Sequence, residues 1–349
     1  MRTFIFGARG YALGAYMAMK SLYPEREVEG FLVSERGINP LSLGGLPVNV
    51  LGEYAAGLSE AEKAEVRIVI ATPEDVQEEI EKTLLSFGFR NIERLGSGAW
   101  AKMMGDYFDS TGEFRTLSSL PAGKDKPDIS IFRACSSFDR KLKNPLVLSG
   151  EYSDVDVETT DGINIAGKNG NYSELTVLYW IWKNHLCDNG LKDKAEYFGL
   201  AQYRRMFELS EEDFLRIAGN DIDVVLPYPL PYEPDINAHH ERYLKEADWS
   251  ALLKALEELQ PEYAKYFPKV LGQKYLYNYN VILAKKSVLK DYCEWLFPIL
   301  ERTEELSDPK GIERSDRYIG YMGETLETLY FMKNSAQLKV VHAGCRMYV

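Results

Sequence analysis

The chain has 349 residues, of which 45% are hydrophobic and 27% are charged, a composition typical of globular proteins. This length exceeds that of one ordinary core and predicts two domains. The formal net charge of −12 argues against a nucleic-acid-binding protein, because phosphate binding requires a basic surface. Any anionic ligand therefore has to be held by a local basic pocket.

The N-terminal residues show no long apolar segment followed by a small-residue cleavage site. No window approaches the ~20 apolar residues that span a bilayer. We therefore expect a cytoplasmic protein, and peripheral association with the inner face of the membrane stays open. The four cysteines lie far apart without CxxC spacing, which predicts neither a zinc site nor a disulfide framework.

The first hundred residues alternate apolar segments with helical patterns. The segments RTFIF, VEGFLV and VRIVIAT are predicted strands over residues 2–6, 28–33 and 66–72. Strands that alternate with helices favour a parallel, Rossmann-like sheet, which we assign to residues 1–105. The turn after the first strand should lie at a helix N-terminus, where backbone N–H groups favour an anion.

Three glycines follow the first strand, Gly7, Gly10 and Gly14, with the spacing G-x-x-G-x-x-x-G. This spacing differs from the G-x-G-x-x-G fingerprint of dinucleotide-binding folds, so an NAD-dependent oxidoreductase is only a third hypothesis. Together with EGFLV (29–33) and GLPV (45–48), the loop resembles the N-terminal Rossmann-like domain of bacterial sugar O-acyltransferases. The resemblance implies an accessory nucleotide or nucleotide-sugar site at Gly7 and Gly10, or else a structural adaptor.

The second half of the chain begins after a stretch without periodicity. Residues 106–127 collect Gly, Ser, Pro and charged residues, and we interpret them as the connection between two domains. The second domain is then expected over residues 128–349. Its first segment, DISIFRA, is a predicted strand.

A polar loop precedes an amphipathic helix in this second domain. Apolar residues recur at helical spacing from Tyr172 to Trp182, and Asn171 with Glu174 fits a capping-box start. The polar residues that the loop brings to this helix end are Asp161, Asn164, Lys168 and Asn169. A lysine at a helix N-terminus opposes the macrodipole unless an anion lies between them, so Lys168 is a candidate anion ligand.

The segment YFGLAQYRRMF places an apolar strand before Gln202, Tyr203, Arg204 and Arg205. In an open α/β sheet, ligands lie outside the carboxyl ends of the strands, so these four side chains are expected beside a ligand. Alternation should send the two arginines to opposite faces unless the chain bends. One arginine would then bind phosphate while the other makes a structural ion pair; pairing of both with nearby acids is the alternative.

Two further patterns contain potential metal ligands. Asp221 and Asp223 form a D-x-D, a pairing that holds a divalent cation in many glycosyltransferases, but they precede their strand and so lie opposite the expected ligand edge. A metal is therefore not supported by them. The adjacent His239 and His240 have no evident third ligand, and we expect them on a loop or helix surface.

Near the C-terminus, the segment SDRYIGYMGETLETLYF is a predicted helix with Glu324 in mostly apolar surroundings. Burial raises the pKa of a carboxyl group, so Glu324 is a candidate general base. An ion pair with Arg317 or Arg204 is the alternative.

Taken together, these segments resemble the bacterial capsular and exopolysaccharide biosynthesis proteins grouped as the domain of unknown function 4422 family, which are regarded as glycosyltransferases. The matching runs within residues 128–349 are DGINIAGKN, YSELTVLYWIWKN, GLAQYRR, PEY, YNYNVILAKK, YCEWLFPIL and RYIGYMGETL. We therefore predict an α/β protein, with an N-terminal Rossmann-like parallel sheet followed by a GT-A-like α/β glycosyltransferase domain.

The chain departs from the family pattern at three places. Gln202 stands where the family has His, and the region of Cys135 and Ser136 replaces an early His-Lys pair. Leu244 stands where a His precedes Asp248 by four residues. These replacements motivate the alternative of a non-catalytic nucleotide-sugar-binding or assembly protein in the same pathway.

The resemblance implies transfer of a sugar from a nucleotide-sugar donor, with a UDP-sugar expected, to a polysaccharide or lipid-linked glycan. Arg204 or Arg205, with Lys168, would neutralise the diphosphate leaving group, and Glu324 would deprotonate the acceptor. Substrate contacts are expected from Asp161, Asn164, Asn169, Gln202, Tyr203 and, on the acceptor side, Asn280. No cofactor beyond the donor is implied.

Overall fold

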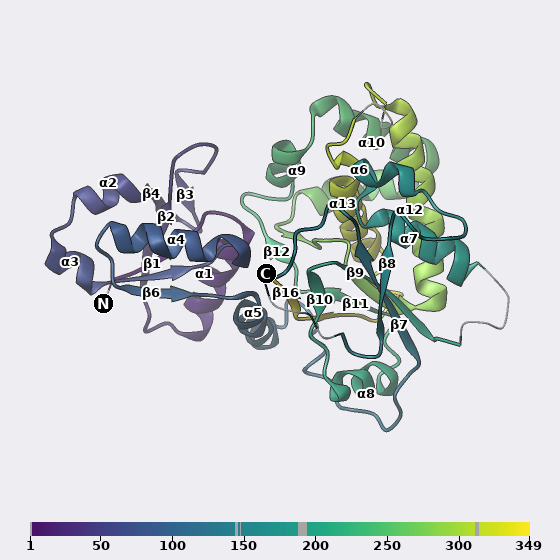
Figure 1. Ribbon diagram of the computed structural model, residues 1–349, viewed down its shortest axis with the longest axis horizontal. Coiled ribbons are helices and arrows are strands. Elements are labelled where there is room, and N and C mark those ends of the chain that lie inside the picture. Colours follow the sequence, from purple (N-terminus) through teal and green to yellow (C-terminus); the bar gives the residue numbers. More distant parts are fainter. Residues whose placement is uncertain (1, 144–145, 147, 188–193, 311–313) are drawn as a thin grey trace.

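The computed structural model describes residues 2–143, 146, 148–187, 194–310 and 314–349. Over these residues the chain forms two α/β units that lie side by side, a smaller N-terminal one and a larger C-terminal one (Figure 1). The α/β class with a parallel first sheet is as predicted.

The smaller unit is built on a six-stranded sheet with the order β3-β4-β2-β1-β5-β6. All neighbouring pairs are parallel except β3 with β4. Its strands are β1 (Arg2–Phe6), β2 (Val28–Val33), β3 (Ser42–Leu43), β4 (Leu46–Val50), β5 (Val66–Ile70) and β6 (Asn91–Arg94). Its helices are α1 (Gly10–Leu22), α2 (Leu51–Ala56), α3 (Glu60–Glu65), α4 (Glu74–Ser86) and α5 (Ser97–Thr111).

Two glycines fix how the smaller unit turns and docks. Gly7 follows β1 with φ +126°, and a Cβ there would lie 2.8 Å from the carbonyl oxygen of Ala71. A Cβ on Gly10 would lie 3.1 Å from the Cβ of Leu230 in the larger unit. The glycine loop therefore allows both the sharp turn after β1 and the close approach of α1 to the larger unit.

The larger unit is built on a mixed eight-stranded sheet. The order β15-β11-β14-β9-β10-β16 forms its main path, and β7 joins β9 to β8. Its strands are β7 (Ile129–Cys135), β8 (Tyr152–Asp156), β9 (Tyr197–Gln202), β10 (Arg205–Phe207), β11 (Val224–Pro227), β14 (Ile282–Lys285), β15 (Val340–Ala343) and β16 (Cys345–Met347). A separate two-stranded sheet pairs β12 (Leu230–Pro231) with β13 (Tyr275–Leu276).

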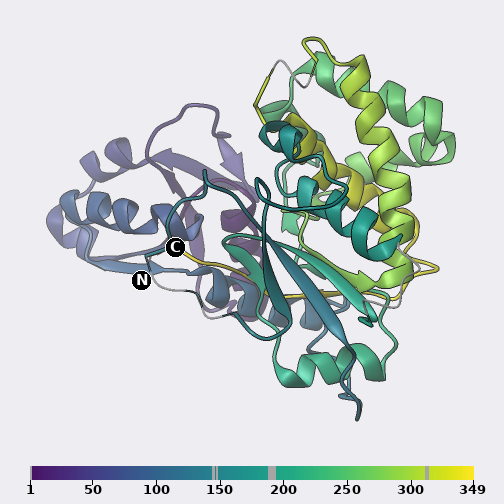
Figure 2. The same ribbon diagram turned by 45° about the vertical axis from the view of Figure 1, so that its right-hand side comes forward.

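Helices cover this sheet unequally. Most of them gather on one side of it, whereas α8 lies on the other (Figures 1 and 2). The α-helices are α6 (Asn169–Tyr172), α7 (Leu175–Ile181), α8 (Glu211–Gly219), α9 (Asn237–Tyr243), α10 (Glu246–Leu259), α11 (Pro261–Leu271), α12 (Lys286–Leu306) and α13 (Tyr318–Lys333). A 3-10 turn, Ala166–Lys168, precedes α6, and a π-turn, Trp182–Leu186, follows α7. None of the described helices has the length and apolar character needed to cross a bilayer.

The helix predicted from Tyr172 is interrupted. Ser173 adopts φ +49°, which ends α6 and lets α7 begin at Leu175. The expected capping box of Asn171 and Glu174 is therefore not formed. Instead, Asn171 binds the backbone of the segment before α13, and the Glu174 carboxylate accepts a hydrogen bond from Asn280.

The two units share a core at their junction. Side chains of α1 and α5 pack in one cluster with Tyr228, Leu230 and Tyr275 of the larger unit. The hydroxyl of Ser97, at the start of α5, bonds both the backbone N–H and the carbonyl of Met347 in β16. The C-terminal strand thus returns to the helix that ends the smaller unit.

A buried ion pair anchors the segment that leads into α13. Both guanidinium nitrogens Nη1 and Nη2 of Arg314 lie 2.7 Å from the carboxylate oxygens of Asp248 on α10. The Asp248 side chain is 0% exposed and that of Arg314 is 7% exposed. Arg314 also bonds Asp316, which is 41% exposed.

Removing one partner of this buried pair should be costly, because the other charge remains out of water. We expect Asp248→Ala to lower the free energy of unfolding by about 3–5 kcal/mol. Asp316→Ala, the matched control at an exposed partner of the same arginine, should cost at most about 1 kcal/mol. Urea denaturation followed by tryptophan fluorescence measures both; equal losses in the two variants would contradict the assignment.

Candidate functional site

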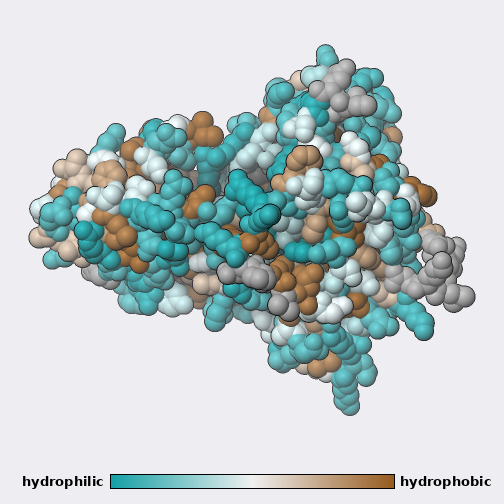
Figure 3. Space-filling view, in the orientation of Figure 1, coloured by the Kyte–Doolittle hydropathy of each residue, from teal (hydrophilic) through white to brown (hydrophobic). Residues whose placement is uncertain are grey.

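One cavity of about 890 Å³ lies between the two units. The carboxyl ends of β1 and β5 in the smaller sheet and of β7, β8 and β9 in the larger sheet all open onto it. Ligands bind at such strand ends in open α/β sheets. Both sheets therefore present their expected ligand edge to the same space, and the face drawn in Figure 3 is largely hydrophilic where the units meet.

The segment from Gln202 to Arg205 lines this cavity, as the sequence predicted, but the chain bends within it. β9 ends at Gln202 and β10 begins at Arg205, and these two residues pair across an antiparallel hairpin. Strand alternation therefore does not apply to the two arginines. Tyr203 lies in the turn, and its carbonyl accepts a hydrogen bond from Arg133.

The two arginines have different partners. Arg204 forms an ion pair with Asp75, in the first turn of α4, at 3.0 Å. Arg205 lies over the ring of Tyr279 at 4.2 Å and donates to Gln202 Oε1 at 3.1 Å. No ion pair of Arg205 occurs in the described part of the chain, and its Nε has no hydrogen-bond partner there. Arg204 is therefore engaged between the units, whereas Arg205 keeps a cation available to the cavity.

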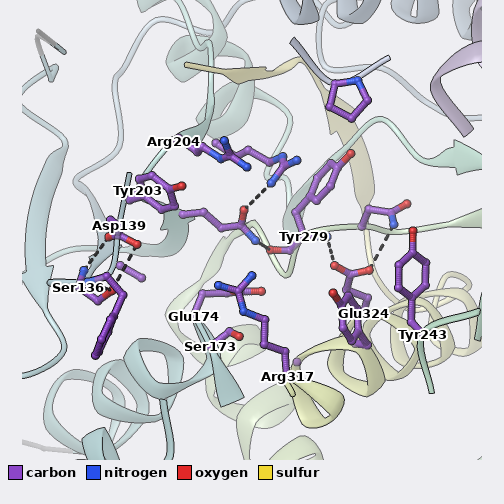
Figure 4. Close-up of a pocket in the computed structure, with 18 of the residues that line it drawn as sticks. Ser136, Asp139, Ser173, Glu174, Tyr203, Arg204, Tyr243, Tyr279, Arg317 and Glu324 are labelled. Carbon is purple, nitrogen blue, oxygen red and sulfur yellow. Dashed lines mark hydrogen bonds between the residues drawn. The ribbon is translucent and has the colours of Figure 1, made fainter. Parts of the chain in front are cut away.

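Glu324, on α13, points into the cavity beside Tyr279 (Figure 4). Its carboxylate accepts hydrogen bonds from the Tyr279 N–H at 3.0 Å and the Asn278 amide at 3.3 Å. Burial, together with the charge of Glu174, raises the pKa of Glu324 to about 8. The alternative ion pairs of Glu324 with Arg204 or Arg317 are not formed. Arg204 pairs with Asp75, and no ion pair among the described residues includes Arg317.

Two more buried carboxyl groups surround Glu324. Burial raises the pKa of Glu174, which also lines the cavity. Burial and the charge of Glu324 raise the pKa of Glu327, one turn further along α13, well above its usual value. Three carboxyl groups in one desolvated region favour retention of protons at neutral pH.

Three more arginines line the cavity: Arg9, Arg242 and Arg317. Among the ion pairs of the described residues, none joins any of the three to a carboxylate. Figure 4 shows Arg317 below Glu174, while Ser136 and Asp139 occupy the far side of the cavity. Phe138, 86% exposed, also lines that side.

The polar loop before α6 contributes less than predicted. Asn169 lines the cavity, but Asp161, Asn164 and Lys168 are outside its lining. Lys168 forms an ion pair with Glu304. The amide of Asn164 bonds carbonyls within its own loop.

Of the other predicted site residues, two glycines line the cavity and one asparagine does not. Gly7 and Gly10 line the cavity. Asn280 is 2% exposed and lies behind the lining, where it donates to Glu174 at 2.7 Å. It therefore orients a cavity residue instead of facing the cavity.

The D-x-D and the histidine pair lie elsewhere. Asp221 and Asp223 both pair with Lys285, away from the cavity lining. The expectation of a surface position for His240 is wrong, because its ring is buried and stacks on Trp249 at 3.8 Å. Within the described ranges, no group of three or more potential metal ligands occurs.

Residue patterns alone did not single out Arg9, Asp75, Glu174, Arg242 or Tyr279 as parts of one site. Arg9 and Asp75 belong to the smaller unit; Arg9 lines the cavity and Asp75 pairs with Arg204 only because the units dock. Tyr279 and Asn280 both adopt positive φ angles, +81° and +51°. The Tyr279 N–H donates to Glu324 and the Asn280 side chain donates to Glu174, and no local pattern predicts these contacts. A signal was present in one case, since Glu174 is an acid in an otherwise apolar helix start.

The stability of the protein should depend on pH through Glu324. The folded pKa of about 8 exceeds the ordinary value of 4.5, so between these pH values the folded state keeps a proton that the unfolded state loses. Wild type should therefore lose about 1.4 kcal/mol of stability per pH unit relative to Glu324→Gln across this range. Urea denaturation at pH 5, 6.5 and 8 measures the difference, with the exposed Glu301→Gln as control. A constant difference would contradict the raised pKa.

Comparison with known proteins places this geometry in context. No curated protein matches the chain. The apo structure of the WbbM bifunctional glycosyltransferase is similar, with a TM-score of 0.50 and 23% identity over 63% of this chain and 45% of that chain. This chain thus spans less than half the length of WbbM, and the likeness shows the fold alone. Core-mannan synthase A (CmsA/Ktr4) from Aspergillus fumigatus, in its Mn/GDP form, reaches a TM-score of only 0.24 at 10% identity over 99% of this chain and 75% of that chain, which supports no argument.

The larger unit also matches a family model. The model described as Domain of unknown function (DUF4422) covers residues 150–335, more than half of the chain. That range contains the hairpin with Arg204 and Arg205 and the helix with Glu324. The resemblance of the smaller unit to sugar O-acyltransferases stays a prediction. The protein belongs to the DUF4422 family.

Proposed function

We propose that this protein is a glycosyltransferase that moves a sugar from a nucleotide-sugar donor to a polysaccharide or lipid-linked glycan acceptor in capsule or exopolysaccharide biosynthesis. The observation that carries the proposal is the buried Glu324 facing unpaired arginines in one cavity at the ligand edge of a glycosyltransferase-like fold. A base and a set of cations are the two elements that glycosyl transfer from a nucleotide diphosphate requires.

The cations would act on the leaving group. As the bond between the anomeric carbon and the diphosphate breaks, negative charge develops on the departing phosphate oxygens. Arg205 and Arg317 line the cavity without a carboxylate partner among the described residues and would stabilise that charge. On the far side, exposed Phe138 offers an aromatic face on which a nucleobase can stack.

Glu324 would act on the acceptor. If the reaction inverts the anomeric carbon, an acceptor hydroxyl would attack that carbon as the bond to the diphosphate breaks and would transfer its proton to the Glu324 carboxylate. The N–H of Tyr279 and the amide of Asn278 hold that carboxylate in place. The Oδ1 of Asn278 is buried, lacks a hydrogen-bond partner among the described residues and would accept a bond from a sugar hydroxyl.

Gln202 supports a second candidate function. Its amide joins Arg205 to the carbonyl of Tyr279, so it maintains the arginine but supplies no titratable group where the family has His. A non-catalytic nucleotide-sugar-binding protein would have the same arrangement. Thermal-shift and product assays with UDP-, GDP- and dTDP-sugars separate the two, because binding without transfer or hydrolysis would favour the second.

Transfer should depend on Glu324 as a base. Wild-type kcat/KM should rise with pH up to about 8, because only the deprotonated carboxylate accepts the proton. Glu324→Gln should lower kcat by about 10²–10⁴-fold and remove this limb of the pH profile. Glu327→Gln, a buried acid on the same helix outside the cavity lining, should stay within about tenfold of wild type. Full activity of Glu324→Gln would exclude the base.

The two adjacent arginines should behave differently. Arg205→Ala should lower kcat by about 10²–10³-fold, through loss of charge stabilisation at the leaving group. Arg204→Ala should lower kcat by the same factor as Asp75→Ala, because both changes break the same ion pair. The double variant should have a kcat no lower than that of either single variant. Steady-state kinetics with the best donor measures all four. Additive losses for Arg204 and Asp75 would show that Arg204 contacts substrate.

A further inference from the structure

The cavity extends past Glu324 to a second pair of cations. Arg9 lies at the N-terminal end of α1, and Arg242 lies near the end of α9 in the larger unit. Both line the cavity. Arg242 contacts the ring of Tyr243, which Figure 4 shows on the side of Glu324 away from Ser136 and Asp139. Arg242 therefore lies next to a ring on the side of Glu324 that faces away from Ser136 and Asp139.

Arg9 and Arg242 carry like charges beside the same cavity. Burial, and in second place repulsion from the exposed Arg242, lowers the pKa of Arg9. The described residues supply no carboxylate to either, and the hydrogen bond that Arg9 donates is a 3.4 Å contact to the carbonyl of Ile38. A doubly charged anion between them would turn this repulsion into two attractions.

The backbone beside Arg9 also favours an anion. α1 has no acidic residue in its first turn and no side-chain cap, so its first N–H groups depend on other partners. Gly7 and Gly10 both line the cavity, and Leu230 of the larger unit packs against Gly10. The loop that the sequence suggested for a nucleotide is thus shared with Arg242 of the other unit.

The loop next to Arg9 exposes two apolar side chains. Ile38 and Leu41, in the loop between β2 and β3, are 71% and 77% exposed. Arg9 is bonded directly to this loop through the Ile38 carbonyl. A ligand whose phosphate lies at Arg9 would therefore have its apolar part beside these two side chains.

We propose that Arg9 and Arg242 form a subsite for the phosphate of the acceptor, a phosphate ester with an apolar chain that leaves the cavity over Ile38 and Leu41. The identification of this ligand as the acceptor rests on the proposed glycosyl transfer. The binding of a phosphate ester at Arg9 and Arg242 does not depend on that function. It assigns a role to the smaller unit: α1 supplies half of the acceptor site.

Binding of farnesyl diphosphate, inorganic pyrophosphate and UDP to the full chain, measured by calorimetry, tests the subsite. Arg9→Ala and Arg242→Ala should each weaken the binding of farnesyl diphosphate at least tenfold and leave the affinity for UDP within twofold of wild type. An Ile38→Ser, Leu41→Ser double variant should bind farnesyl diphosphate more weakly than wild type but should bind pyrophosphate equally well. Arg26→Ala, an exposed arginine of the same unit, is the matched control, and Arg9→Lys should recover part of the affinity.

The outcomes separate the sources of the phosphate. Loss of UDP affinity in the Arg9 and Arg242 variants would overturn the proposal, because the pair would then hold the donor. Farnesyl diphosphate binding that ignores both arginines would also overturn it. Arginine-dependent binding of farnesyl diphosphate supports the subsite even where no sugar transfer is detected, so failure of the proposed function can be distinguished from failure of this inference.

Discussion

The close approach of α1 to β12 is the contact on which the site depends. Gly10 lets the helix backbone lie against Leu230, and the shared core of α1, α5 and the aromatic residues of the larger unit holds that position. Because the units dock at this point, the carboxyl ends of both sheets face one cavity. A side chain at Gly10 would crowd Leu230 and Pro231 and require the contact between α1 and β12 to shift. The glycine loop therefore has a packing function as well as an electrostatic one.

The cavity combines buried acids with cations that are mostly unpaired. Glu174, Glu324 and Glu327 are desolvated together, and their mutual repulsion keeps them from all being charged at neutral pH. The arginines around them remain charged at any physiological pH. The site is consequently more positive than its residue count suggests, in a protein with a net charge of −12. Local burial, and not overall composition, sets the sign of the field that a diphosphate would meet.

Sequence patterns predicted the regular parts of the fold well. The predicted strands at β1, β2, β5, β7 and β9 and the predicted helix α13 coincide with apolar runs, which reflect burial within each unit. The break at Ser173 was missed because it depends on a positive φ angle that serine rarely adopts. The very short strands β10 and β16 carry too few residues for a period to be visible.

Candidate site residues were predicted where they end a strand. Gln202, Tyr203, Arg204 and Arg205 face the cavity because strand ends converge at one edge of a sheet. The different partners of the two arginines were outside the reach of a pattern, since Asp75 comes from the other unit. Lys168, Asp161 and Asn164 share the polarity of ligand residues, but Lys168 pairs with Glu304, Asn164 bonds a carbonyl of its own loop, and Asp161 is exposed outside the cavity lining. Polarity alone does not distinguish a side chain that faces a ligand from one that bonds to other protein groups.

The return of β16 to α5 bears on how the two units move. The units are joined by the chain that follows α5, by the shared core of α1 and α5 with Leu230, and where Ser97 bonds the backbone of Met347. Contacts at several separate points restrict the rotation of one unit relative to the other. Substrates would therefore reach a cavity whose two walls keep a nearly constant spacing, and entry must rely on side chains and loops at its rim.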